Sequence, residues 1–315
     1  MRVKLGIVAE ANEKFLNQVK LLIYSFRENG GLHKDIPVVL ITNDKPISEK
    51  DRNFLEKNFA PIEFETMPRL GAIPHTSKLN VFYAVDPDSY DALIFMDCDT
   101  VVIKPFDEML DPIKNESAEF LCRRGGKSDI ESFVDFDSLV KEYCGNNFNK
   151  DSPFKVLFDG KKEWPMFNTG VFAVTPDAAK KIRDDSINIT YKIFNEWRIR
   201  NIIEKIPLAS LLYKMNILKS KKKVIPSWPI EQGAVALSCI KSGVKVKYLD
   251  EVYNSWGNLE DLKILHCFKS AYKFDRKKMF LKESDKWIKE YEESDVYGKR
   301  VIANILKDYK SIYPE

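Results

Sequence analysis

Residues 92–110 read ALIFMDCDTVVIKPFDEML, and this stretch decides the fold class. Its first five residues, Ala92 to Met96, form an apolar run that is typical of a buried β-strand, and Asp97 and Asp99 follow directly. Open α/β sheets bind their ligands outside the carboxyl ends of their strands. We therefore expect a sheet strand that delivers two carboxylates to a ligand-binding edge.

Upstream of this stretch, strand-like and helix-like segments alternate. Strands are expected over residues 3–9, 37–42 and 62–66, with helices over residues 12–30, 48–59 and 77–85. Asn12 and Ser48 are residue types that begin helices, because their side-chain oxygens accept hydrogen bonds from first-turn N–H groups. The order β-α-β-α-β-α-β predicts an α/β fold with a mixed, mostly parallel central sheet flanked by helices on both faces.

The second half of the chain is less regular. Residues 123–166 show no clean period and are interpreted as an insertion beside the sheet. Order returns with a strand at 170–174, a helix from Pro176, a separate longer helix near 188–206, a helix at 231–240 and strands at 244–249 and 263–268. Two amphipathic helices are expected from Ser284 onward. We accordingly predict one domain over residues 1–275 and a helical C-terminal extension over residues 276–315.

Composition narrows the class of protein. With 315 residues, 44% of them hydrophobic and 31% charged, the chain is an ordinary globular protein. The net charge of +3 argues against nucleic-acid binding, and no apolar run approaches the ~18 residues of a spanning helix. The N-terminal apolar run meets Glu10 before the core of a secretory signal could form, so we expect no classical signal. Five cysteines without a C-x-x-C pair argue against a disulfide framework and a thiolate zinc site. We expect a cytoplasmic protein, with peripheral attachment to a membrane left open.

Asp97 and Asp99 carry the clearest chemistry. Carboxylate oxygens are the ligands that Mg²⁺ and Mn²⁺ prefer, and an ion so held can take its remaining ligands from a diphosphate. A turn in which both acids are merely solvated is an equally good interpretation of an isolated Asp-x-Asp. The sequence around the motif is needed to distinguish a metal site from a solvated turn.

That context resembles one family. The phrase YDALIFMDCDTVVIKPFDEML at 90–110, with SKL at 77–79, FNTGV at 167–171, EQGA at 231–234 and His266 at the end of a late strand, is similar to the glycogenin-like family 8 glycosyltransferases. The motifs occur in the same order, and the resemblance covers roughly residues 3–275. It departs from the family where the late segment lacks the usual Gly and Pro-Trp, and where the first strand ends without an aromatic residue to stack on uracil.

The resemblance implies a GT-A fold and transfer of a sugar from a nucleotide-sugar donor, usually a UDP-sugar, with retention of configuration. It implies Mn²⁺, or Mg²⁺, as cofactor. The residues that it implies are, for the metal, Asp97, Asp99 and His266; for the donor, Lys78, Asp97, Gly170 and either Lys269 or Lys273; and for catalysis, Glu231, Gln232 and Asn168. The acceptor, whether a carbohydrate, a lipid-linked molecule or a protein, is not named by the sequence.

Two other readings fit part of the same residues. Asp97-Cys98-Asp99-Thr100-Val101 also resembles the haloacid-dehalogenase phosphatase motif, with Asp97 as nucleophile, although that family places the motif on its first strand. A non-catalytic sugar-nucleotide-binding protein is the third reading. Trp164, Trp228 and Trp256 are candidates for a sugar-stacking platform, with core packing as the alternative for each.

Overall fold

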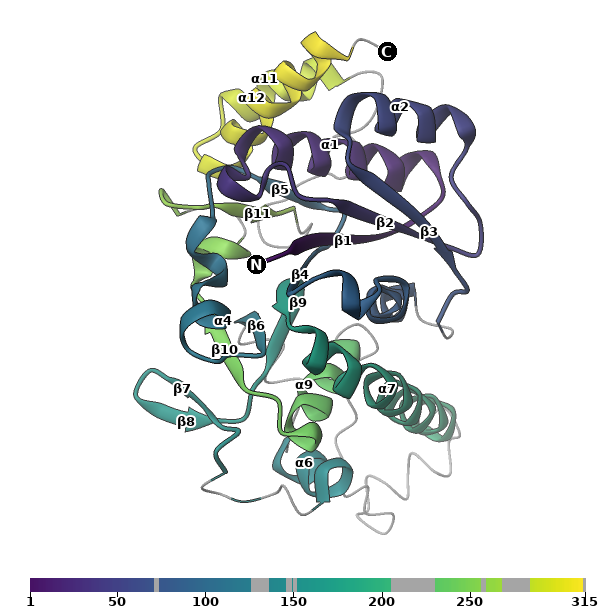
Figure 1. The fold of residues 1–315 in the computed structure, drawn as a ribbon, viewed down its shortest axis with the longest axis vertical. Coiled ribbons are helices and arrows are strands. Elements are labelled where there is room, and N and C mark those ends of the chain that lie inside the picture. Colours follow the sequence, from purple (N-terminus) through teal and green to yellow (C-terminus); the bar gives the residue numbers. More distant parts are fainter. Residues whose placement is uncertain are drawn as a thin grey trace.

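The computed structural model describes residues 1–70, 74–125, 136–145, 149, 152–204, 230–255, 259–267 and 284–313. Among these residues, one central sheet has seven strands: β1 (Val3–Glu10), β2 (Val38–Asn43), β3 (Ile62–Met67), β4 (Ala92–Met96), β6 (Phe120–Arg124), β9 (Phe167–Val174) and β10 (Val246–Leu249). Their spatial order is β10-β6-β9-β4-β1-β2-β3 (Figure 1). β9 runs antiparallel to its neighbours β4 and β6, and the other four pairings are parallel. The predicted mixed, mostly parallel sheet is confirmed.

Helices cover both faces of the sheet. The strands present alternate residues to the two sides, so that Leu5 and Ile7 enter one core and Val8 enters the other. The first core is closed by α1 (Glu13–Asn29) and α2 (Glu49–Phe59). The second is closed by α3 (Val81–Ala84), α7 (Pro176–Glu204) and α9 (Ile230–Ser242), which lie on the opposite side of the sheet in Figure 1.

The predicted helix starts at Asn12 and Ser48 are confirmed. The Asn12 side chain accepts a hydrogen bond from the N–H of Phe15, and Ser48 accepts one from the N–H of Asp51. The third predicted helix is different, because residues Pro74–Asn80 form a 3₁₀ helix and only α3 is α-helical. Its side chains bind the preceding loop: Ser77 accepts from the N–H of Leu70, and Asn80 donates to the carbonyl of Pro68.

Three further expectations need correction. The two helices predicted around residues 176–206 are one continuous helix, α7, which contains no glycine and no proline after Pro176 to interrupt it. The region 123–166, predicted as an irregular insertion, begins within a strand of the central sheet, β6. The late strand, β11 (Ile264–His266), pairs not with the central sheet but with β5 (Thr100–Val102), which the sequence did not predict.

Smaller elements lie on either side of β6 and at the end of the chain. The short helix α4 (Asp111–Asn115) precedes β6, and α6 (Phe136–Cys144) and the hairpin of β7 (Val156–Phe158) and β8 (Lys161–Glu163) follow it. The two predicted C-terminal helices are present as α11 (Ser284–Glu292) and α12 (Tyr297–Ile312), and they lie above α1 in Figure 1. Tyr24 of α1 meets Tyr309 edge-on, with ring centroids 5.4 Å apart.

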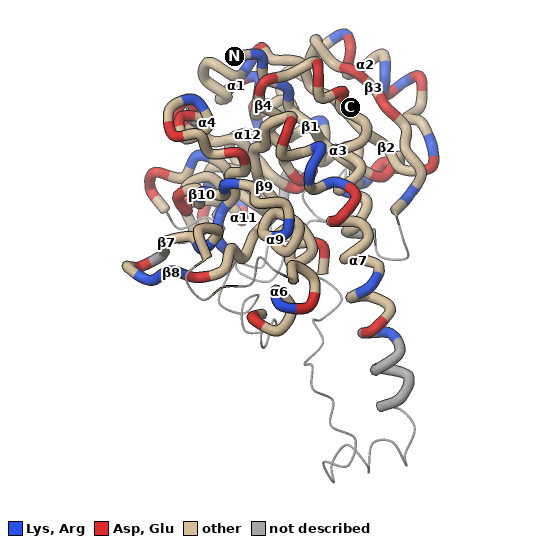
Figure 2. The backbone as a smooth tube through the Cα atoms, turned by 60° about the horizontal axis from the view of Figure 1, so that its bottom comes forward, with Lys and Arg blue, Asp and Glu red and all other residues tan. Residues whose placement is uncertain are grey.

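Basic and acidic residues are interspersed along the described backbone, as Figure 2 shows. Many of them pair, including Lys4 with Glu63 and Lys20 with Asp51. No helix in the described residues combines the length and the apolar character that a membrane crossing requires.

Candidate metal centre

The two aspartates lie in a turn that links the central sheet to the small sheet. The N–H of Asp97, directly after β4, donates to the carbonyl of Gly170 on β9 at 2.8 Å. The carbonyl of Asp97 then accepts from both the N–H and the hydroxyl of Thr100, which closes the turn. Because Thr100 begins β5 and lies opposite His266 in the β5–β11 pair, the turn brings both aspartates to the histidine.

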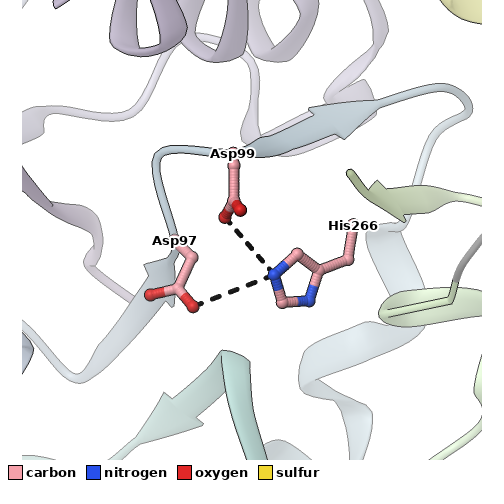
Figure 3. A group of neighbouring side chains, drawn as sticks. All are labelled: Asp97, Asp99 and His266. Atoms are coloured by element: carbon pink, nitrogen blue, oxygen red, sulfur yellow. Dashed lines mark ion pairs between the residues drawn. The ribbon is translucent and has the colours of Figure 1, made fainter. Parts of the chain in front are cut away.

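Asp97, Asp99 and His266 converge on one point (Figure 3). His266 Nε2 lies 3.3 Å from Asp99 Oδ1 and 4.0 Å from Asp97 Oδ2. One ligand atom from each residue lies within 4.8 Å of the other two. Around a cation with bonds of ~2.1 Å, ligands at right angles to each other lie about 3.0 Å apart, so these donors fit an open divalent site with two oxygens and one nitrogen.

Gly170 and Asn168 lie behind the histidine. A Cβ on Gly170 would lie 2.6 Å from Cε1 and 2.7 Å from Nδ1 of His266, closer than side chains approach one another. Asn168 Oδ1 accepts the N–H of Gly170 at 3.0 Å, where β9 slips in register so that Cys122 faces Phe172 and Arg123 faces Asn168. The Asn-Thr-Gly string thus forms an irregularity in β9 that makes room for the imidazole. Asn168 Nδ2 donates to no atom of the described residues.

Lys78 is held beside the aspartates by three side chains. Its Nζ lies 3.1 Å from Asp97 Oδ2, 3.3 Å from Thr169 Oγ1 and 3.6 Å from Glu231 Oε1. Burial by itself lowers the pKa of Lys78, but the carboxylates of Asp97 and Glu231 outweigh that effect and raise its pKa above the usual value. The site therefore contains a permanent positive charge next to Asp97.

Glu231 and Gln232 lie in the first turn of α9 and differ in their hydrogen bonding. The Glu231 side chain is 3% exposed and forms the ion pair with Lys78. The Oε1 atom of Gln232 is buried and accepts no hydrogen bond from any described residue. A buried amide oxygen without a donor is uncommon in native proteins, and such an atom in a binding site is available to a ligand.

A polar group lies where the first three strands of the sheet end. Glu10, the last residue of β1, accepts from Arg69 at 2.5 Å and from Asn43 at 3.4 Å, and Asn43 in turn accepts from Asn80. β1 ends without the aromatic residue that often stacks on uracil in the family, as the sequence indicated. Hydrogen-bonding groups occupy this edge in its place.

Four of the residues named from the sequence, Lys269, Lys273, Trp228 and Trp256, lie outside the described residues. Trp164 is buried, donates to Asp137 and has Lys155 over its ring, which favours core packing over a sugar platform.

Sequence reasoning missed two residues at the site. Thr169 was read only as part of the Asn-Thr-Gly string, although its hydroxyl binds Lys78. Asn254 lies in a stretch without a motif, yet its side chain contacts both Asn168 and His266. Nothing in the local sequence signals Asn254, since its role depends on two strands that meet only in the folded chain.

No family model matches the chain, and no curated protein matches it. Among solved structures, the chain is similar to mouse xyloside xylosyltransferase 1 in its apo form (12% identity, 84% of this chain and 97% of that chain covered, TM-score 0.47). It is also similar to core-mannan synthase A from Aspergillus fumigatus in its Mn/GDP form (8% identity, 79% and 73% covered, TM-score 0.46).

A third similarity is to the WbbM bifunctional glycosyltransferase (16% identity, 80% of this chain, TM-score 0.45), of which the chain spans 39%. With TM-scores below 0.5, these three likenesses carry no argument about this chain, and the functional conclusion depends on the residues of the site.

Proposed function

We propose that the protein is a metal-dependent glycosyltransferase of GT-A type that moves a sugar from a nucleotide-sugar donor to an acceptor hydroxyl. The observation that carries this proposal is the convergence of Asp97, Asp99 and His266 at the carboxyl end of β4, with Lys78 beside them. These residues come from separate parts of the sequence, and the family 8 resemblance assigned them to one site. That resemblance makes a UDP-sugar the first donor to test and retention the expected outcome.

Asp97, Asp99 and His266 would hold Mn²⁺ or Mg²⁺. A divalent ion there would stabilise the negative charge that builds on the departing nucleoside diphosphate. The donor set suits this ion, since two carboxylates and one imidazole leave room for phosphate oxygens.

Lys78 supplies a second positive charge for the donor. Its ammonium is held by Asp97, Thr169 and Glu231, so it needs little reorganisation when an anion arrives. We assign Glu231 to keeping this lysine charged and in place, because the carboxylate is buried and already paired. This differs from a nucleophile, which would need an open face toward the sugar.

Gln232 and Asn168 are assigned to the donor sugar. Gln232 offers an oxygen that accepts no hydrogen bond among the described residues, and Asn168 offers an Nδ2 that donates none there. One acceptor and one donor of this kind can orient sugar hydroxyls without acting as strong bases. That suits a retaining transfer in which the acceptor arrives on the face that the diphosphate leaves.

The test is a panel of nucleotide sugars with and without Mn²⁺, read by thermal shift and by release of the nucleoside diphosphate. We expect a Mn²⁺-dependent rise in melting temperature with one donor, since a ligand of the native state stabilises it by mass action. Asp99→Asn should lose that rise, and Asp88→Asn, which changes an exposed carboxylate, should keep it.

Two other outcomes would identify the alternative functions. A phosphatase would trap beryllofluoride at Asp97, and a donor that binds without ever being turned over would identify a binding protein. Either result contradicts the transferase.

A further inference from the structure

A chain of hydrogen bonds fixes which atoms face one another behind His266. The backbone N–H of Gly170 can only donate, so the Asn168 atom that it contacts at 3.0 Å is the oxygen Oδ1. The Asn254 atom 3.0 Å from that same oxygen must then be its amide nitrogen. The other end of the Asn254 amide, its Oδ1, lies 2.9 Å from Nδ1 of His266.

Each assignment of a donor or an acceptor in this chain determines the next one. Because an amide oxygen can only accept, Nδ1 of His266 must carry a hydrogen and donate it to Asn254. In the neutral imidazole the other nitrogen, Nε2, then has a lone pair. Nε2 is the atom that faces Asp99 and Asp97. A lone pair directed at carboxylate oxygens is repulsive on its own and favourable when a cation lies between them.

Asn254 is itself held in place. It is fully buried, and its backbone carbonyl accepts from the Arg123 guanidinium at 2.5 Å. Arg123 also pairs with Glu251, which precedes Asn254 by three residues. Gly170 also lies against the imidazole, where a Cβ would come within 2.6 Å of Cε1. The ring is therefore confined by the backbone at Gly170 and by an amide that cannot rotate without losing two hydrogen bonds.

We propose that Asn254 is a positioning residue that fixes His266 as the Nδ1–H tautomer, so that Nε2 offers its lone pair to a divalent ion between Asp97 and Asp99. This inference rests on the proposed function for the ion and on the hydrogen bonds for the tautomer. Partners of this kind, which bind the outer nitrogen of a ligating histidine, typically change metal affinity by about 10–100-fold.

The metal test uses Mn²⁺ alone, titrated into the protein and followed by the electron paramagnetic resonance signal of the free ion. Asn254→Ala should weaken Mn²⁺ binding by about 10–100-fold. Thr190→Ala, which removes a buried side chain that donates to the carbonyl of Ser186 within α7, should bind Mn²⁺ like the unsubstituted protein. Equal Mn²⁺ affinity in Asn254→Ala and in the unsubstituted protein would overturn the inference.

The tautomer test needs no metal. In protein with ¹⁵N-labelled histidine, at a pH where the imidazole is neutral, long-range ¹H–¹⁵N spectra distinguish Nδ1–H from Nε2–H, and His266→Gln identifies the resonances. We expect Nδ1–H for His266 and a changed tautomer ratio in Asn254→Ala. An Nε2–H form of His266 in the unsubstituted protein would contradict the inference even if Mn²⁺ binds. Absence of Mn²⁺ binding would count against the proposed function, and the spectrum would still decide the role of Asn254.

Discussion

At the scale of single residues, Gly170 shows why the Asn-Thr-Gly string has its composition. The family resemblance assigned this glycine to the donor. In the structure its missing side chain is the space that the His266 ring occupies, and its N–H begins the hydrogen-bond chain to Asn254. The room that the His266 ring needs accounts for a glycine here without any contact to a sugar.

Gly170→Ala is therefore expected to displace His266, because a Cβ would lie 2.6 Å from the ring. We predict at least a tenfold loss of Mn²⁺ affinity, equivalent to about 1.4 kcal/mol, measured by titration of the ion alone. Gly145→Ala is the control: that glycine has φ of +53° and no heavy atom within 4 Å of its Cβ position, so its substitution strains the backbone without displacing a neighbouring side chain. Unchanged Mn²⁺ affinity in Gly170→Ala would mean that the ring can move aside without consequence.

Glu231 and Gln232 are neighbours with different expected effects. Gln232→Ala removes an oxygen without a described partner, so turnover should fall about tenfold or more while the melting temperature stays nearly constant. Glu231→Ala removes one of two carboxylates that hold buried Lys78, so it should lower turnover and also cost about 1–3 kcal/mol of stability. Steady-state kinetics and urea unfolding of both variants separate the two roles. The same stability loss in both would contradict the assignment.

At the scale of elements, three segments meet at the centre. β4 with its turn supplies Asp97 and Asp99, the 3₁₀ helix Pro74–Asn80 supplies Lys78, and β11 supplies His266. The small β5–β11 sheet is what brings the histidine, which is far away in sequence, to the end of β4. The C-terminal helices α11 and α12 do not contribute to this group and instead complete the core on the α1 side.

Substitution of Ile302 in α12 tests whether the C-terminal helices unfold together with the rest of the protein. It is fully buried in the core that α1 and the sheet share, and Ile302→Ala should cost about 2–5 kcal/mol. Ile312→Ala makes the same change at an exposed position of the same helix and should have little effect. Urea unfolding should show one shifted transition. A separate early transition for α11 and α12 would instead support an independent extension, as the predicted boundary at residue 275 allows.

At the scale of the whole molecule, buried His33 links stability to pH. Its ring lies 5.3 Å from that of Phe106, and its Nε2 accepts or donates no hydrogen bond within the described residues. Burial lowers the pKa of His33, an effect that the nearby Asp107 only partly opposes. Because the unfolded chain, with a histidine pKa of about 6.5, takes up this proton before the folded protein does, acid favours unfolding.

The contribution of His33 to stability should be fully present above about pH 6.5 and lost as the pH falls through the lowered pKa of the folded state. His33→Leu should remove this part of the pH dependence. The measurement is urea unfolding of both proteins between roughly pH 5 and 7.5, with the difference between them isolating His33. Parallel curves over that range would show that His33 takes up its proton equally easily in both states.

The sequence by itself determined the alternating half of the sheet, the helix starts at Asn12 and Ser48, and the strand Ala92–Met96 with two carboxylates after it. These features follow from local periodicity and from side chains that bond their own backbone, so a short window contains the information. The resemblance of scattered motifs also indicated that Asp97, Asp99 and His266 belong together.

Only the tertiary structure decided the rest. β6 and β5 are short segments whose strand character comes from partners far along the chain, β9 and β10 in one case and β11 in the other. Asn254 and the space at Gly170 have meaning only where β9, β11 and the segment before β11 meet. Long-range pairing chooses these contacts, because a hydrogen bond between side chains 86 positions apart, as between Asn168 and Asn254, leaves no periodic trace in the sequence.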